Sequence, residues 1–307
     1  MTIRHLKIFI AVAETGKMSS AAVKYFISQP SVSQAIKELE THYGVLLFER
    51  IAKKLYITDA GKNLLNYARV AVKQFDELDK YMLAEGHAEK IRIGATVTVG
   101  SCMLSSILSR FRERMPQVEP FCYVNNTRSI EDKILKAELD IGIIEGQVKS
   151  HDLVNTPAVK DYLVIVCAKN HRLAGRKRVS LQELRNELFV MREEGSGTRE
   201  LFENYMHQSG VELKIGWEVT CPGVIKDIVL ENNCLAAISI RLVAEEIKSG
   251  RMYVIKSKDN DWDRSFNIAY YKNKYITDSM KSVIEIVREY NSTDILQGIR
   301  AGMLLND

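Results

Sequence analysis

The sequence has no apolar run long enough to cross a membrane. Its first apolar run, residues 8–13, follows basic residues but is too short for a signal peptide and is stopped by Glu14. The five cysteines form no CxxC pair, so we interpret them as small hydrophobic residues of a reducing compartment rather than as disulfides or metal ligands. We therefore expect a cytoplasmic protein without a membrane span.

The motifs of common enzyme classes are also absent. Gly195-Ser196-Gly197 is not a nucleophile elbow, because that motif has its glycines two residues from the serine, and no P-loop lysine follows it. The six histidines have no spacing of the HExxH type. Asp140 and Glu145 flank a predicted strand and could suggest paired acids, although an aspartate at a strand start is more often a turn residue. We predict that the chain is not an enzyme and holds no metal or cofactor.

The net charge of +4 is unevenly distributed along the 307 residues. Residues 1–62 hold nine of the 43 Lys and Arg and five of the 39 Asp and Glu, which leaves 34 of each sign in the remainder. Hydrophobic residues at 46% and charged residues at 27% are ordinary for a globular chain of two or three domains. A basic N-terminal module joined to a neutral body indicates a polyanionic partner for the module.

Residues 28–40, SQPSVSQAIKELE, predict the helix around which this module is organised. Ser28 can cap the helix, and Pro30 fits its first turn. A buried stripe is expected at Val32, Ile36, Leu39 and Tyr43. The opposite face is short, polar or basic, which suits base edges and phosphates in the major groove of double-stranded DNA. The predicted DNA-binding residues of this helix are Gln29, Pro30, Ser31, Ser33, Gln34 and Lys37.

Two shorter helices precede the polar-faced helix, over residues 3–15 and from Ser19 or Ser20 to about Phe26. Three helices in this order fit a helix-turn-helix. Two strand-like pieces then flank a basic tip, which predicts a β-wing. Phosphate contacts are expected from the second helix and from the wing; the residues concerned are Ser19, Lys24, Arg50, Lys53 and Lys54.

A long helix is predicted from Thr58 to about Glu85. Apolar residues recur along it with alternating spacings of four and three, which is the pattern of a coiled-coil seam. The seam consists of Leu64, Ala68, Ala71, Phe75, Leu78 and Met82. We predict that two copies of the chain pair along it, the alternative being a helix that only covers its own domain.

Four blocks between Leu6 and Gly61 occur in a characteristic order and spacing: FIAVAETGKMSSAA, SQPSVSQAIKELE, GVLLFER and LYITDAGK. In these blocks the chain resembles the DNA-binding domain of the bacterial LysR-type transcriptional regulators. The resemblance implies a linker helix through which two subunits dimerise. It also implies tetramers that bend DNA and change the spacing of their DNA-binding domains when an effector binds.

From Lys90 onward predicted strands and helices alternate, which indicates an α/β body of about 200 residues that could form two subdomains. The resemblance implies the fold of periplasmic solute-binding proteins for this body. We therefore predict a multi-domain α/β protein. Its predicted parts are a winged helix-turn-helix at 1–58, a linker helix at 59–88 and an effector domain at 89–307, with lobe I at about 89–161 and 267–295 and lobe II at about 162–266.

Three predicted helix starts carry small polar residues, and such starts can bind anions through free N–H groups and hydroxyls. Each hydroxyl taken alone is more readily explained as a cap of its own helix, but three such starts facing one cleft favour a pocket. The resemblance also matches Thr96, Thr98 and Ser196 to positions that line the family's effector pocket. We predict a small, anionic effector in a cleft with Thr96, Thr98, Ser101, Asn126, Thr127, Ser196, Gly197 and Thr198.

The sequence thus predicts a ligand-responsive DNA-binding regulator of transcription. The alternative is a cytoplasmic solute-binding protein without a role at DNA, which the basic N-terminal module disfavours. The identity of the effector, the target genes, activation as against repression, the choice of dimer or tetramer and the role of residues 293–307 stay open at this level.

Overall fold

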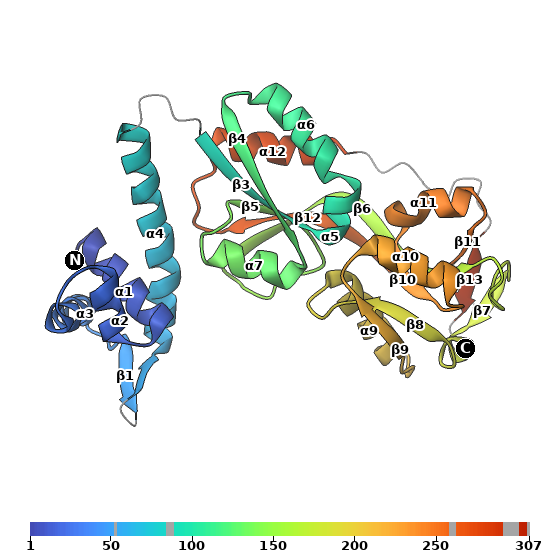
Figure 1. The fold of residues 1–307 in the computed structure, drawn as a ribbon, viewed down its shortest axis with the longest axis horizontal. Coiled ribbons are helices and arrows are strands. Elements are labelled where there is room, and N and C mark those ends of the chain that lie inside the picture. The colour runs from blue at the N-terminus through green and yellow to red at the C-terminus, as the bar shows by residue number, and fades with distance from the viewer. Residues whose placement is uncertain (52–53, 84–88, 258–261, 291–300, 306–307) are drawn as a thin grey trace. The chain divides into compact units, whose positions relative to one another are not determined.

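The computed structural model describes residues 1–51, 54–83, 89–257, 262–290 and 301–305 (Figure 1). The chain separates into two compact units, of which one contains Met1–His87 and the other contains Ala88–Ile134 and Glu138–Asp307. Lys53 of the predicted wing lies outside the described residues, as does the predicted end of the long helix. Within the described part of the chain, no helix is both long and apolar enough to cross a membrane.

The first unit packs three helices and a two-stranded hairpin against the start of a long fourth helix. Its elements are α1 (Ile3–Thr15), α2 (Met18–Lys24), α3 (Gln29–Tyr43), β1 (Phe48–Ile51), β2 (Lys54–Ile57) and α4 (Asp59–Leu83). The strands β1 and β2 are antiparallel and form the predicted wing. The core contains the apolar stripes of α1, α2 and α3, and Ala68 of α4 is buried in it. Helix α4 therefore belongs to the first unit and covers one side of its core.

The ends of α3 follow from the sequence. The Ser28 hydroxyl accepts a hydrogen bond from the Ser31 N–H at 3.2 Å and caps the helix. Gly44 ends the helix in the left-handed region, with φ of 69°. The expected stripe is buried at its first three positions, but Tyr43 is exposed because it stands in the last turn, where its hydroxyl lies 2.8 Å from the Met1 sulfur.

The turn between α2 and α3 contains an unusual residue. Phe26 has a φ of 52°, and its side chain is 96% exposed. Two bonds cross the turn, from the Ile27 N–H to the Ala22 carbonyl at 3.0 Å and from the Phe26 N–H to the Val23 carbonyl at 3.3 Å. This pair of bonds is a Schellman motif, whose left-handed position is normally glycine. Phe26 therefore adopts a strained backbone conformation without burying its ring.

We expect Phe26→Gly to stabilise the first unit by about 0.5–1 kcal/mol, because glycine relieves the left-handed strain of about 1–2 kcal/mol and loses somewhat more backbone entropy on folding. Urea denaturation followed by circular dichroism measures the change. Val23→Gly is the control, since Val23 is also exposed but helical, and it should destabilise the unit by about 1 kcal/mol. A loss of stability with Phe26→Gly would show that the backbone of Phe26 is not strained.

The second unit alternates strands and helices, as the sequence predicts. Its elements up to α9 are β3 (Glu89–Thr96), α5 (Val97–Cys102), α6 (Leu104–Arg114), β4 (Val118–Asn125), α7 (Thr127–Leu135), β5 (Ile141–Glu145), β6 (Leu153–Ala168), β7 (Arg178–Ser180), α8 (Leu181–Leu184), β8 (Leu188–Arg192) and α9 (Gly197–Gln208). The remaining elements are β9 (Lys214–Val219), α10 (Pro222–Glu231), β10 (Ala236–Ser239), α11 (Ile240–Lys248), β11 (Met252–Ser257), β12 (Asp263–Tyr271), α12 (Asp278–Arg288) and β13 (Gly302–Leu305).

Nine of these strands form one mixed sheet in the order β4-β3-β5-β12-β6-β11-β13-β7, with β10 also pairing with β6. The first part of β6 pairs with β12, whereas its last part pairs with β10 and β11. Strands β6 and β12 therefore run through the middle of the sheet and join two lobes (Figure 1). We call the half with β3, β4, β5, α5, α6, α7 and α12 lobe I, and the half with β7 to β11, β13 and α8 to α11 lobe II.

Each lobe has its own hydrophobic core. In lobe I, apolar residues of β3 and β5 pack with those of α5, α6 and α12. In lobe II, two clusters lie on opposite sides of the sheet, one against α9 and one against α10 and α11. Among the strands that the structure describes, β6 and β12 run from one core to the other in the middle of the sheet, which is the position of a hinge.

The C-terminal segment returns to lobe II. Helix α12 packs in the core of lobe I, but β13 pairs in parallel with both β11 and β7. Leu304 is buried in the core of lobe II, and a side chain on Gly302 would meet the Arg176 carbonyl oxygen at 2.5 Å. The strand at Gly302–Leu305 therefore completes the sheet of lobe II, a role that the sequence does not indicate.

Candidate DNA-binding and effector sites

The predicted DNA-reading face of α3 is exposed along its whole length. Its six predicted residues, Gln29, Pro30, Ser31, Ser33, Gln34 and Lys37, are all exposed, opposite the buried stripe. The Gln34 side-chain N–H₂ donates to the Glu38 carboxylate at 2.9 Å. The Gln34 amide can still present both an acceptor and a second donor to a base edge.

The predicted phosphate contacts are also exposed where the structure describes them. Ser19 and Lys24 lie on α2, and Arg50 and Lys54 lie on the two strands of the wing. The Arg50 guanidinium lies 3.8 Å from the Met18 sulfur, which brings the wing close to the start of α2. Exposed cations on both elements can contact a phosphate backbone.

The seam predicted on α4 is divided between two uses. Ala68 is buried and Leu64 half-buried in the unit's own core, so these two positions provide little free surface. The remaining seam positions are exposed, and Tyr67 extends the same stripe toward the start of the helix. The exposed apolar stripe consists of Tyr67, Ala71, Phe75, Leu78 and Met82. A stripe of this kind at helical spacing indicates a partner helix.

A cavity of about 220 Å³ lies between the lobes, where α7 of lobe I and α9 of lobe II begin. Its lining comes from α7, from the segment after β5, from the loop before α9 and from α9 itself. The lining residues are Thr127, Arg128, Glu131, Gln147, Lys149, Glu194, Gly195, Ser196, Arg199, Glu200, Glu203 and Asn204. This volume fits a small ligand held between the positive ends of two helices.

Most charges around this cavity are already paired. Lys149 lies 3.5 Å from Glu200, and Arg199 lies 2.8 Å from Glu203. The Glu131 carboxylate accepts hydrogen bonds from the backbone after β5, including the Ser150 N–H at 2.7 Å. The Arg128 guanidinium is exposed and makes no ion pair with any residue that the structure describes. Arg128 is therefore available to an anionic ligand, and sequence reasoning missed it.

Two of the predicted hydroxyls do not cap their own helices. Ser196 stands at the N-cap of α9 and Thr96 at the N-cap of α5, but neither side chain bonds to its helix. Both hydroxyl oxygens are buried and have no hydrogen-bond partner among the described residues. Leaving a buried polar group unpaired costs about 1–3 kcal/mol. The explanation of these residues as simple caps therefore fails, and a bound polar molecule can supply the missing partners.

The other predicted effector residues have different surroundings. Thr127 donates to the Glu145 carbonyl oxygen at 2.8 Å, and Asn126 donates across the lobes to the Glu194 carbonyl oxygen at 3.3 Å. Ser101 is exposed and donates to the Val97 carbonyl oxygen of its own helix. Of the eight predicted residues, Thr127 and Ser196 line the cavity, whereas Thr96, Thr98, Ser101, Asn126, Gly197 and Thr198 do not.

The lobes meet tightly beside the cavity. A Cβ atom on Gly197, the first residue of α9, would lie 2.5 Å from the Glu145 carbonyl oxygen and 3.2 Å from the Thr127 hydroxyl oxygen. The absence of a side chain at Gly197 therefore allows α9 to contact the end of β5.

A buried group of charged residues lies next to this contact. Arg264 on β12 donates to the Asp161 carboxylate at 2.8 Å and to the Thr198 hydroxyl at 2.9 Å. Its guanidinium also lies 3.1 Å from the Glu145 carboxylate, and Arg192 lies 3.8 Å from the same group. Burial lowers the pKa of Arg264, but the carboxylates of Glu145 and Asp161 outweigh burial and raise it, so the side chain stays charged.

Sequence reasoning did not find this buried group because its members are far apart in the chain. They lie on β5, β6, β8, α9 and β12, and of these residues only Thr198 stands at a helix start that the sequence analysis singles out. Asp161 and Arg264 lie directly opposite each other in the paired strands β6 and β12, so their contact follows from the strand register.

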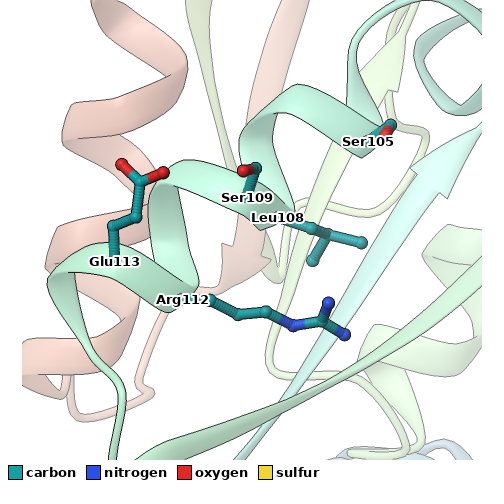
Figure 2. Close-up of a pocket in the computed structure, with 5 residues that line it drawn as sticks. All are labelled: Ser105, Leu108, Ser109, Arg112 and Glu113. Carbon is teal, nitrogen blue, oxygen red and sulfur yellow. The ribbon is translucent and has the colours of Figure 1, made fainter.

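A second hollow, of about 450 Å³, lies on the surface of α6 in lobe I. Figure 2 shows that the five side chains which line it all rise from this one helix; they are Ser105, Leu108, Ser109, Arg112 and Glu113. The neighbouring strand β4 is an edge of the sheet and exposes Phe121 and Val124. A shallow hollow next to an exposed apolar strand resembles a protein contact surface more than a ligand site.

Three cysteines, of which Cys167 and Cys234 are buried and Cys102 is half-buried, have the environment of packing residues. Burial raises the pKa of Cys102 and of Cys167 to about 12, and the pKa of Cys234 to about 11. These thiols stay protonated at neutral pH and are poor nucleophiles and metal ligands. Among the described residues no group of three or more His, Cys, Asp and Glu side chains could hold a metal ion.

A winged helix-turn-helix unit followed by a two-lobed α/β unit with a cavity between its lobes is the architecture of a ligand-controlled DNA-binding protein. Comparison with family models gives the same assignment. Residues 3–62 match the bacterial regulatory helix-turn-helix protein of the lysR family, and residues 84–292 match the LysR substrate binding domain.

Individual relatives agree. The HTH-type transcriptional regulator CysL of Bacillus subtilis is 31% identical over 244 residues, which are 79% of this chain and 82% of the relative. The regulatory domain of CcmR from Synechocystis PCC6803, solved in complex with 2-PG, has a TM-score of 0.61 at 21% identity and covers 66% of this chain and all of that one. CbnR, a structure of which contains its target DNA, has a TM-score of 0.56 at 21% identity and covers 94% and 99% of the two chains.

The chain therefore belongs to the LysR family of transcriptional regulators. It is a ligand-responsive, sequence-specific DNA-binding regulator, with its helix-turn-helix in the first unit and its effector-binding unit in the second.

Proposed function

We propose that this regulator acts as a homo-oligomer in the cytoplasm, reads its operator with α3 and responds to a small anionic effector bound between the lobes. The domain division we propose is a DNA-binding domain at 1–58, a linker at 59–88 and an effector domain at 89–307, with lobes that cross near residues 161 and 267. The separate cores of the two units and of the two lobes support the boundary near residue 88 and the division into lobes, while the start of the linker packs in the core of the DNA-binding unit. The named relatives are regulators of transcription, and we propose no catalytic role.

The exposed polar face of α3 supports its role in base readout, and the exposed cations support phosphate contact. We expect Gln34→Ala to weaken binding to a specific operator by about 10–100-fold, since a side chain that pairs with a base contributes about 1–3 kcal/mol of discrimination. Lys54→Ala should weaken specific and random DNA alike and reduce the salt dependence by about one phosphate contact. Fluorescence anisotropy at several salt concentrations measures both effects.

The outcome for Gln34→Ala decides whether α3 reads bases. Equal losses on specific and random DNA for Gln34→Ala would count against base readout by α3.

The buried, unpartnered hydroxyl of Ser196 is the observation that carries the effector proposal. It lies on the wall of the cavity at the start of α9, where backbone N–H groups and the helix dipole also favour an anion. Arg128 supplies an unpaired positive charge on the opposite lobe. A ligand held by both would contact both lobes at once, so its binding would favour one arrangement of the lobes over another.

We expect Ser196→Ala and Arg128→Gln each to weaken effector binding by about tenfold or more, because each removes one polar contact to the ligand. A panel of small carboxylates and phosphate esters, with 2-PG included, is titrated by calorimetry to find a ligand for the unmodified protein. Arg178→Gln, the same substitution at an exposed residue that does not line the cavity, should bind as the unmodified protein does. Unchanged affinity in both cavity variants would exclude this cavity.

Two surfaces support self-association. The exposed stripe on α4 can pair two DNA-binding units, which suits a twofold-symmetric operator. The α6 hollow and the exposed apolar side chains of β4 offer a second surface on lobe I (Figure 2). Two independent surfaces are what a tetramer requires, and we propose a tetramer built from dimers.

A further inference from the structure

We propose that Arg264 is a positioning residue that holds the α9 wall of the effector cavity against lobe I and so sets how far the lobes are apart. The inference deepens the proposed function, because the wall that Arg264 holds is the wall that carries Ser196. In this proposal the buried Arg264 side chain connects the cavity wall to β6 and β12, the strands that join the lobes.

The contacts of Arg264 reach three separate parts of the second unit. The guanidinium bonds to Asp161 on β6, which is its neighbour across the strand pair joining the lobes. It bonds to Thr198 in the first turn of α9, in lobe II. It also lies against the Glu145 carboxylate at the end of β5, in lobe I. A guanidinium is the side chain that can do this, since its five donors point in fixed and different directions.

Two of these partners, Thr198 and Glu145, are connected to the cavity. Thr198 lies two residues after Ser196 in the first turn of α9, and the backbone of Glu145 accepts the hydrogen bond of Thr127. Ser196 and Thr127 both line the cavity, one from each lobe. Arg264 is therefore placed where the two walls of the cavity and the joining strands come together.

Separation of the lobes would affect these contacts unequally. The contacts of Arg264 with Asp161 and Glu145 lie within one part of the sheet, because β12 pairs with both β6 and β5, and they would persist. The bond to Thr198 reaches from this part of the sheet to α9 of lobe II and would be lost. Arg192, on β8 of lobe II, also approaches Glu145. The two Glu145 oxygens have no geometrically good hydrogen bond in the structure, although both lie near a guanidinium. The contacts across the lobes are therefore one hydrogen bond, from Arg264 to Thr198, and one longer approach of charges, from Arg192 to Glu145, and they can be broken without disturbing the bond to Asp161.

Hydrogen exchange of the full-length chain without ligand tests the proposal. The variants are Thr198→Val, which removes one bond of Arg264, and Arg264→Lys, which keeps the charge but carries all its donors on one nitrogen instead of spreading them over a planar fork. We expect both to speed exchange by fivefold or more at the backbone amides of residues 193–200 and 145–149, and to leave the cores of both lobes unchanged. Lys226→Met is the control, since Lys226 pairs with Glu246 within lobe II alone, and it should leave these two segments as they are.

Each other outcome overturns the proposal. Uniformly faster exchange over the whole second unit would show that Arg264 only stabilises the fold, and exchange in Arg264→Lys equal to that of the unmodified chain would show that its forked geometry is not needed. Because no ligand is present, the result does not depend on the effector. Failure of the effector titrations and failure of this test are therefore separate results.

Discussion

Leu78→Glu should leave the regulator folded but unable to hold two DNA-binding units together, and its affinity for a two-half-site operator should fall by about 100-fold or more. Leu78 is 54% exposed and lies between Phe75 and Met82 in the stripe on α4. If two α4 helices pair along this stripe, the substitution places a carboxylate in an apolar seam, where its desolvation opposes pairing. Losing the paired subunit removes the effective concentration that links binding at the two half-sites, which is typically a factor of about 10²–10⁴.

Analytical ultracentrifugation and anisotropy on one-half-site and two-half-site DNA measure this prediction together. Binding to a single half-site should change little, because the α3 face is untouched. Leu188→Glu is the matched control, since it is the same substitution at an exposed strand residue of the second unit. If Leu78→Glu kept both the oligomeric state and the operator affinity of the unmodified chain, the α4 stripe would not be the pairing surface.

Gly197→Ala should loosen the contact between the lobes and weaken effector binding by about tenfold or more. The added methyl group would lie 2.5 Å from the backbone oxygen of Glu145, so α9 or the end of β5 has to shift. Overpacking of this kind costs about 1–3 kcal/mol of stability. The shift moves the wall that carries Ser196, which is why a residue without a side chain should affect affinity.

Gly223→Ala is the matched control for Gly197→Ala. Gly223 also lies in the first turn of a lobe II helix, but a Cβ atom there would meet only the Cys221 sulfur, at 3.7 Å. This variant should be neutral or slightly stabilised, because alanine loses less backbone entropy in a helix than glycine does. Thermal denaturation and calorimetric titration compare the two. If both variants behaved alike, the close approach at Gly197 would have no role in the cavity.

The sequence predicts the first unit well because its signals are local. The cap at Ser28, the stop at Gly44 and the apolar spacing of α3 each depend on a few neighbouring residues. The seam on α4 shows the limit of such signals. Leu64 and Leu78 both fit the seam spacing, yet Leu64 packs in the core of its own unit while Leu78 is exposed. The spacing alone does not tell a core position from a position that is free to pair with another helix.

In the second unit, the strand and contacts that the sequence does not predict have one cause. They depend on pairing partners that lie far away in the chain. Residues 153–162 contain Pro157, Lys160 and Asp161 and do not read as a strand, but they pair with β12 and form the first part of β6. The cavity is partly predictable, since helix starts with hydroxyls are visible in the sequence. Arg264 is not, because its role arises only where β12 meets α9 and β5.

The position of β13 has a consequence for synthesis of the chain. Strand β7 pairs with β13, which follows it by more than a hundred residues and is the last of the described strands to leave the ribosome. Until then the edges of β7 and β11 have no partner at this place, and the site of Leu304 in the core of lobe II is empty. Lobe II is thus completed only when β13 pairs with β7, which lies far before it in the chain. Pairing between such distant strands is slow, and until it occurs the unpaired strand edges can aggregate. Shortened translation products would lack a finished lobe II even when lobe I and the DNA-binding unit have folded.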